Sequence, residues 1–333
     1  MKNIILFFGF LFCLGCAQEP WVKNRNHGNA LGTTFAITYV ADRELDYQRE
    51  IDSLFMAVDR SMSTYREDSD ISKINAGDTS TVVDAMFREV FAISDGVHAA
   101  TKGHFDPTVG VLADAWGFGP GEQLELDSLK VDSLLQYVGW DKVELMADNT
   151  IAKAHRAIKF DFNAVAKGYT VDRLGVLLDS KGIKNYLVEL GGEVLAKGHN
   201  PISGIPWTVG IDDPQVETGR ELKRIVLLED KAMATSGNYR KFRLDPDTGE
   251  KYVHTIDPLT GYTKNSKVLA VSVMASTCAL ADAFATAFMA MELEGSKEIL
   301  SDHEELEAYI IHLDQTGNTQ EFMTDGFRAR IKQ

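Results

Sequence analysis

Cysteine is scarce in this sequence, and its scarcity excludes two kinds of structure. Only Cys13, Cys16 and Cys278 are present. The first two belong to an N-terminal segment that we expect to be processed, so Cys278 has no partner for an internal disulfide. A thiol-rich metal site is excluded for the same reason. Cys278 lies at the start of an apolar helical pattern, where an inert core residue is more common than a nucleophile.

Positive charge is also in short supply. The chain has 333 residues, of which 34 are Lys or Arg and 49 are Asp or Glu, so its formal net charge is -15. It contains no stripe of Lys and Arg, and we expect no nucleic acid partner because such proteins normally show a basic footprint. Internal repeats and low-complexity linkers are absent as well. The hydrophobic fraction of 44% is typical of a globular protein.

The apolar run at the N-terminus is too short to span a bilayer as a mature helix. Lys2 precedes this run, which ends in Leu14-Gly15-Cys16-Ala17. The ending resembles a bacterial lipobox, in which cleavage falls before the cysteine and the cysteine is diacylated. Two or more acyl chains anchor a protein strongly to lipid. The alternative is an ordinary secretory signal with an incidental cysteine.

This pattern predicts the organisation of the whole chain. We expect a lipoprotein signal peptide over residues 1–15, a tether over 16–30 and one domain over 31–333. Strand and helix patterns alternate through the domain without regular βαβ order, which predicts an α+β fold with mixed or antiparallel sheets and packed helices. Expected strands cover residues 31–40, 157–160, 186–190, 207–211, 224–228, 239–244, 251–256, 268–274 and 308–313. Expected helices cover residues 45–58, 84–102 with a break near Gly96, 126–138 and 277–291.

The stretch from Lys159 to Gly198 predicts a strand, a turn and a further helix, with polar residues at the helix entry. Asn163 can cap that helix, and Gly182 suits its C-terminal end. Asp161 and Lys167 flank the entry. A helix N-terminus favours an anion such as a phosphate, so a nucleotide site is one interpretation. In the other, the acid and the amide only cap and the lysine is only solvated.

Two loops are expected on either side of the second helix. Residues 62–71 are polar, and the span 103–120 holds several glycines and prolines that disfavour regular structure. Tyr65 in the first loop could stack on a planar ring, although such a tyrosine is more often half-buried at a surface.

Asp282 and Thr286 are four residues apart in an almost wholly apolar helix, so they share one face. A buried carboxylate is costly unless it is compensated. Two oxygen ligands without a nearby Cys or His suit Mg²⁺ better than zinc. The alternative is an aspartate that backbone donors hold in place.

His254 lies on an expected strand beside a turn that carries Asp257. A histidine with a nearby acid can act as a general base. A surface or core histidine without a catalytic role is the alternative that the residues alone leave open.

Eight sequence blocks occur in the order that is typical of one known family. They are LGTTF, MSTYREDSDISKIN, GHFDPTVGVLADAWGFG, DFNAVAKGYTVDRLG, YLVELGGEVLAKG, ATSGNYR, HTIDPLTG and ALADAFATA. Over nearly its whole mature length the chain resembles the FAD:protein FMN transferase (ApbE) family, several members of which are periplasmic lipoproteins. The resemblance implies an ApbE-like architecture related to the T-fold.

The resemblance also implies the residues of the site. Leu31 stands where the family usually has a methionine that contacts FAD, and its apolar side chain should keep the packing. Other implied FAD-contacting positions are Tyr65, His104, Phe105, Asp106, Asp161, Lys167 and Ile256. The implied Mg²⁺ ligands are the Ala164 carbonyl, Asp282 and Thr286. His254 matches the proposed catalytic base, and we expect Asp257 to steer it.

The implied reaction moves FMN from FAD to a threonine hydroxyl of a target protein, with Mg²⁺, and releases AMP. The target resembles, by family, the flavin-carrying subunits of ion-pumping redox complexes. Two alternatives remain, namely an Mg²⁺-dependent FAD pyrophosphatase and a non-catalytic FAD-binding lipoprotein. Lipidation of Cys16 would place the protein on the periplasmic side of a membrane.

Overall fold

An antiparallel sheet of eight strands forms the centre of the part of the chain that the computed structural model describes, namely residues 21–216, 221–237, 242–244, 251–253, 255–263 and 267–332. Its strand order is β1-β2-β5-β6-β9-β12-β13-β14. All neighbouring pairs in it are antiparallel. The strands are β1 Val22–Ala30, β2 Thr33–Ala41, β5 Asn185–Leu190, β6 Glu193–Lys197, β9 Lys231–Gly237, β12 Val268–Ala275, β13 Glu307–Leu313 and β14 Thr319–Met323. The expected α+β fold with antiparallel pairing is confirmed.

Three two-stranded ribbons accompany the large sheet in the described residues. They pair β3 (Val143–Leu145) with β4 (Ile151–Lys153), β7 (Trp207–Asp212) with β8 (Leu222–Leu228), and β10 (Phe242–Leu244) with β11 (Lys251–Val253).

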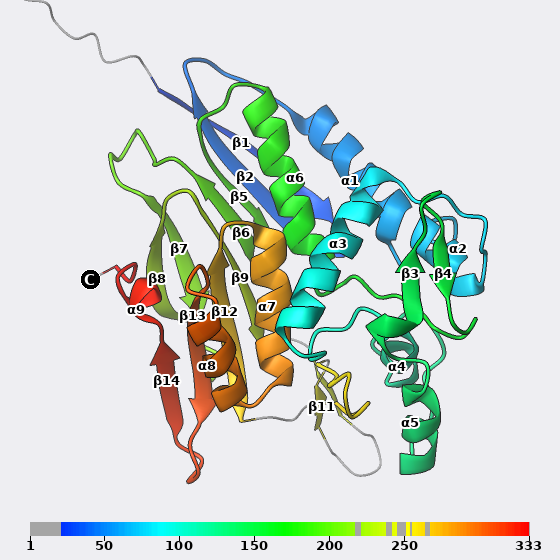
Figure 1. Cartoon of the computed structure of the whole chain (residues 1–333). Helices are drawn as coiled ribbons and strands as arrows, with labels where there is room; N and C mark the ends of the chain where they lie inside the picture. The colour runs from blue at the N-terminus through cyan, green and yellow to red at the C-terminus, as the bar shows by residue number, and fades with distance from the viewer. Residues whose placement is uncertain are drawn as a thin grey trace, which may run out of the picture.

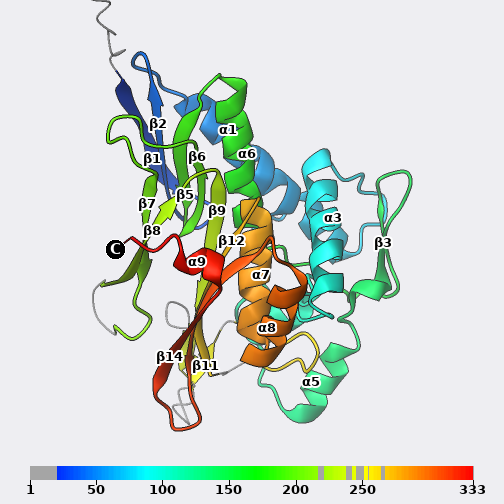
Figure 2. The same cartoon turned by 60° about the vertical axis from the view of Figure 1, so that its left-hand side comes forward.

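Most helices of the described residues lie on one side of the large sheet. The helices are α1 Gln48–Met62, α2 Asp70–Ala76, α3 Ala85–Ala100, α4 Gly110–Ala115, α5 Ser128–Leu135, α6 Ala166–Ser180, α7 Cys278–Ala290, α8 Leu293–Asp302 and α9 Asp325–Arg328, with a 3-10 turn η1 at Trp140–Lys142. Figure 2 shows α6, α7 and α8 on one side of the sheet and the β7–β8 ribbon with α9 on the other. Helix α3 packs outside α7, and α2, α4, α5 and the β3–β4 ribbon extend from there (Figure 1).

The composition of β12 follows from this layering. Val271, Val273 and Ala275 belong to the core under α7, whereas Ala270 and Met274 belong to the core under the β7–β8 ribbon. Because both faces of the strand are covered, its sequence is almost continuously apolar and does not alternate with polar residues. Helix α7 is likewise buried on nearly every side, so its sequence is also almost continuously apolar.

The N-terminal boundary differs from expectation. Residues 22–30, which we assigned to a tether, form β1 and pair with the whole of β2. Asn24 and Asn26 are buried, and their amides bind the segment that leads into α1. The low apolar content of this stretch was misleading, because the strand contributes hydrogen-bonded amides to the core edge instead of apolar side chains.

Several local predictions also need correction. The polar loop 62–71 ends early, because Ser69 caps α2 by accepting a hydrogen bond from the Ser72 amide. The glycine-rich span 103–120 contains α4. Helix α3 runs through Gly96 without a break. The expected strand at 157–160 makes only an isolated bridge between Lys159 and Val109.

None of the described helices is long and apolar enough to cross a membrane.

Replacing Asn26 with alanine tests the assignment of β1 to the domain. The Asn26 amide donates to Asp46 and Gln48 and accepts from the Tyr39 hydroxyl. We expect Asn26→Ala to lower the free energy of unfolding by about 1–3 kcal/mol, because buried polar groups lose their partners. Denaturant titration measures the change. The exposed Asn29→Ala is the control, and equal stability of the two variants would contradict the assignment.

Candidate active site at the α6–α7 contact

The helices α6 and α7 approach each other closely at Gly168. A Cβ at Gly168 would lie 2.3 Å from the Cys278 carbonyl oxygen and 2.8 Å from the Cβ of Asp282. The Gly168 amide donates a hydrogen bond of 3.0 Å to Oδ2 of Asp282. Only glycine permits this distance, so the first turn of α6 directly holds the carboxylate of α7.

Asp172 strengthens the same contact one turn further along α6. Its carboxylate accepts the amides of Cys278 at 2.7 Å and Ala279 at 2.8 Å, which are the first residues of α7. Burial raises the pKa of Asp172 to about 6, while these two amides act in the opposite direction. Asp172 therefore caps α7 from outside the helix and fixes its start relative to α6.

Asp282 is buried beside one cation and a second acid. Its side chain is almost fully buried, its Oδ1 lies 3.8 Å from Nζ of Lys167, and Lys167 forms a short ion pair with Oε1 of Glu193. Burial raises the pKa of Asp282 to about 7, although the charge of Lys167 lowers it and Glu193 raises it further. Burial disfavours the charged form of Lys167, but Asp282 and Glu193 outweigh it and raise the pKa of the lysine.

The other expected metal ligands lie near Asp282 in the fold. Thr286 is one turn further along α7, and its Oγ1 is 3.3 Å from the Ser236 hydroxyl on β9. Ala164 precedes α6, four residues before the Gly168 amide that holds Asp282. Within the described ranges no group of three or more His, Cys, Asp and Glu side chains forms a metal site. A cation here would therefore depend on hydroxyl and carbonyl oxygens and on the substrate.

The helix entry is built differently from expectation. Asp161 accepts the Asn163 amide at 2.7 Å, and its own amide donates to the Pro107 carbonyl. Asn163 is exposed, and Val165 occupies the cap position of α6 without a side-chain hydrogen bond. The predicted Asn163 cap is therefore wrong, because Asp161 organises the turn. Burial raises the pKa of Asp161, against the effect of the Asn163 contact.

In the loop at 103–110, the carboxylate of Asp106 binds other groups of the protein. Asp106 accepts from the amide and hydroxyl of Thr108 and from the Trp140 amide, and Phe105 is packed in the core. Burial raises the pKa of Asp106 despite these contacts. Since both side chains are engaged within the protein, an FAD contact at these two positions would have to come from the backbone.

The segment 255–263 packs against this region. Nδ1 of His104 lies 3.7 Å from Oδ1 of Asp257, and the same oxygen accepts the Leu259 amide at 3.0 Å. Ile256 packs against the cluster around α4 and α5. His254 lies outside the described residues, so its catalytic role and its steering by Asp257 stay predictions.

Tyr65 and Leu31 occupy turns at the rim. Tyr65 is 66% exposed, and its hydroxyl is 3.4 Å from the Phe118 carbonyl oxygen. Leu31 has a φ of 49° in the two-residue turn between β1 and β2, not the start of a strand. Gly191, in the turn between β5 and β6, donates to the Thr34 carbonyl, so the two turns lie side by side.

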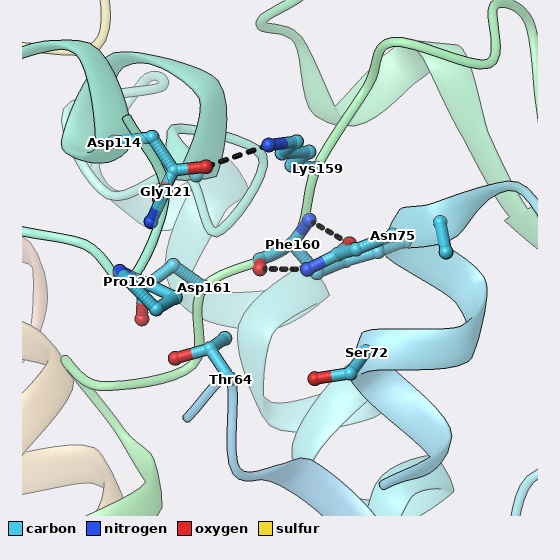
Figure 3. A pocket seen from close by; sticks show the side chains of 11 residues that line it. Thr64, Ser72, Asn75, Asp114, Pro120, Gly121, Lys159, Phe160 and Asp161 are labelled. Atoms are coloured by element: carbon cyan, nitrogen blue, oxygen red, sulfur yellow. Dashed lines mark hydrogen bonds and ion pairs between the residues drawn. The ribbon is translucent and has the colours of Figure 1, made fainter. Parts of the chain in front are cut away.

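A cavity of about 270 Å³ opens beside the helix entry (Figure 3). Lys159 pairs with Asp114 at 2.7 Å across it, and the Asn75 amide group brackets the backbone of Phe160 through two hydrogen bonds. Asp161 contributes to the lining. The sequence reasoning did not single out the Lys159–Asp114 pair, because the two residues are 45 positions apart.

Glu193 and Asp172 were also missed. Glu193 directly follows the Gly191-Gly192 turn, which the sequence marked only as a turn. The available signal in the sequence was an acidic residue directly after the turn between two apolar strand patterns. Asp172 lies in the interior of an amphipathic helix, where an acid is commonly solvated. Nothing in its spacing indicated the two α7 amides.

Replacing Gly168 with alanine tests the close approach of α6 and α7. We expect Gly168→Ala to lower the free energy of unfolding by about 2–4 kcal/mol, because the new methyl group would collide with backbone. Gly96→Ala in α3 is the matched control, since nothing lies within 4 Å of the added Cβ. The control should be neutral or more stable by up to about 1 kcal/mol. A tolerated Gly168→Ala would disprove the contact.

Comparisons with known proteins identify the family of this chain. The profile of the ApbE family matches residues 31–310. The chain is 34% identical over 302 residues to the FAD:protein FMN transferase of Vibrio cholerae, covering 87% of this chain and 88% of that protein. It is 31% identical over 324 residues to the enzyme of the same name from Haemophilus influenzae, covering 93% and 92%. The structure of the flavin transferase ApbE from Vibrio cholerae has a TM-score of 0.83 at 31% identity, over 93% of this chain and 100% of that one. The chain belongs to the ApbE family.

Proposed function

We propose that this protein is an FAD:protein FMN transferase that uses Mg²⁺ to move FMN from FAD onto a threonine hydroxyl of an acceptor protein. The transferase class follows from the family and from relatives that carry this name. The observation that supports the metal is the buried Asp282 carboxylate, held by the Gly168 amide with Thr286 one turn away.

The donor set around Asp282 suits a hard divalent cation. The carboxylate and hydroxyl oxygens of Asp282 and Thr286 would hold Mg²⁺ together with the Ala164 carbonyl. No thiol of the described residues other than that of Cys278 is nearby to favour a softer metal, and burial raises the pKa of that thiol well above its usual range. When bound, Mg²⁺ supplies positive charge that neutralises the pyrophosphate of FAD.

The remaining chemistry belongs to side chains of this chain. Lys167 would direct its charge toward the phosphates, and the positive end of the α6 macrodipole would support them. His254 would accept the proton of the threonine hydroxyl. The threonine oxygen then bonds to the phosphorus of FMN while the bond to the bridging oxygen breaks, and AMP leaves with that oxygen.

Two further features suit a dinucleotide. The exposed ring of Tyr65 offers a surface on which a planar ring system can stack. The cavity lined by Asp161 and Lys159 would take one end of FAD, because Asp161 lies at the helix entry and lines the cavity as well. His104, Phe105, Asp106, Ile256 and Leu31 would complete the contacts.

We also propose that Cys16 carries lipid and anchors the domain on the periplasmic side of a membrane. The lipobox-like ending of the N-terminal apolar run supports this location. Residues 1–15 would then be removed as a signal peptide. Cys16 and the run lie outside the described residues.

An acceptor assay distinguishes the proposed reaction from its alternatives. The protein is incubated with FAD, Mg²⁺ and a threonine-containing flavinylation peptide, and flavin fluorescence on the peptide is measured. Transfer supports the proposal, free FMN indicates a pyrophosphatase, and unchanged FAD indicates a binding protein. We expect Asp282→Asn to reduce transfer about a hundredfold or more, because it removes the charge but not the shape of the ligand.

Glu294→Gln is the control for that assay, since it removes an acid from the exposed face of α8. It should leave transfer unchanged. Full transfer by Asp282→Asn would remove the metal assignment. We expect His254→Ala to bind FAD but to transfer poorly.

The raised pKa of Asp282 predicts a pH dependence of Mg²⁺ binding. Below its pKa of about 7 the carboxylate is protonated, and the proton must leave before the cation binds. The dissociation constant of Mg²⁺ should therefore rise by up to about tenfold for each unit that the pH falls below the pKa, and level off above it. Calorimetry in buffers of different ionisation enthalpy measures the accompanying proton release. An affinity that stays constant from about pH 5 to pH 8 would contradict the assignment.

A further inference from the structure

Glu193 is buried next to the proposed metal site, yet only one of its two carboxylate oxygens has a hydrogen-bond partner among the described residues. It is 3% exposed, and its Oε1 binds Nζ of Lys167. Its Oε2 has no hydrogen-bond partner among the described residues. A buried carboxylate oxygen without a partner is costly, so Glu193 at this place calls for a role beyond packing.

The geometry of Lys167 indicates that role. Its ammonium group makes direct contact with Glu193, while Oδ1 of Asp282 is 3.8 Å away. Both carboxylates are almost fully buried, and Lys167 forms an ion pair with each of them, the closer one with Glu193. Among the described residues, Asp282 would be the only carboxylate left to pair with this lysine if Glu193 were neutral.

A lysine paired with Asp282 would compete with a divalent cation for the same carboxylate. Coulomb interactions between such groups are strong where water is excluded, so the choice of partner decides how much negative charge Asp282 offers. Glu193 is placed to decide this, because it begins β6 directly after the Gly191-Gly192 turn, where both glycines have positive φ.

We propose that Glu193 is a positioning residue that draws Lys167 toward itself, limits its pairing with Asp282 to the longer contact, and so keeps the Asp282 carboxylate available to Mg²⁺. The proposal rests on the magnesium site of the proposed function. It assigns Glu193 no contact with the reacting atoms.

A double-mutant cycle on Mg²⁺ affinity tests this role. The dissociation constant of Mg²⁺ alone is measured by calorimetry, without FAD, so that a lost FAD contact at Lys167 has no influence. The proteins are the wild type, Glu193→Gln, Lys167→Met and the double variant. We expect Glu193→Gln to weaken Mg²⁺ binding about tenfold, and Lys167→Met to restore most of that loss in the Glu193→Gln background.

The cycle separates positioning from a simple change in net charge. If Glu193 acted only through its charge, Lys167→Met would change the Mg²⁺ affinity by the same factor, within about twofold, in both backgrounds. That result would overturn the proposal, as would an unchanged affinity of Glu193→Gln. A larger effect of Lys167→Met in the Glu193→Gln background supports it.

Two further variants complete the experiment. Glu189→Gln is the control, because it removes an acid from the facing strand of the same hairpin. The Glu189 carboxylate accepts the Gly192 amide. This variant should change the Mg²⁺ affinity by less than about twofold. Glu193→Asp keeps the charge and should bind Mg²⁺ more tightly than a folded Glu193→Gln. If Glu193→Gln fails to fold, Glu193→Asp, whose shorter side chain retreats from Lys167, takes its place in the cycle, and an equal effect of Lys167→Met in both backgrounds would overturn the proposal. Equal affinity of Glu193→Asp and a folded Glu193→Gln would overturn the proposal.

Asp282→Asn distinguishes a failure of the proposed magnesium site from a failure of the proposed role of Glu193. If it binds Mg²⁺ as tightly as the wild type, the metal site itself is wrong and the role of Glu193 falls with it. If it loses Mg²⁺ while Glu193→Gln binds normally, only the role of Glu193 is wrong.

Discussion

The contact between α6 and α7 at Gly168 is the constraint on which the site depends. A buried carboxylate is unfavourable unless donors surround it, and the Gly168 amide supplies one at 3.0 Å because no side chain separates the helices. Asp172 binds the first amides of α7 from the next turn of α6. Together these contacts fix the distance and rotation of the two helices, so Asp282 is held by backbone that cannot move independently.

The large sheet also supports the site, through the contact between Glu193 and Lys167. Its antiparallel strands place the β1–β2 turn and the β5–β6 turn side by side, and Glu193 begins the strand that follows the second turn. Lys167 on α6 connects this end of the sheet to Asp282 on α7 through its two acids. A charge network that joins three elements is specified by the positions of all three, which makes the site a property of the layered architecture.

Periodic patterns in the sequence predicted the apolar elements well. The apolar run of β12, the buried helix α7 and the common face of Asp282 and Thr286 all follow from spacing, because burial on a regular element leaves a repeat in the sequence. Elements that use polar residues were missed. The strand β1 buries asparagine side chains, and α2 begins at a serine within a polar loop, so neither shows the apolar repeat on which such predictions rest.

The sequence by itself determined which residue types occur at the site, their spacing along α7 and the order of the family blocks. Only the tertiary structure decided which charges meet. Lys167 and Glu193 are 26 positions apart, and the Gly168 amide that holds Asp282 is 114 positions away from it. Such pairs are set by how helices and strands pack across the sheet, and local spacing carries no information about a partner that another element brings into contact.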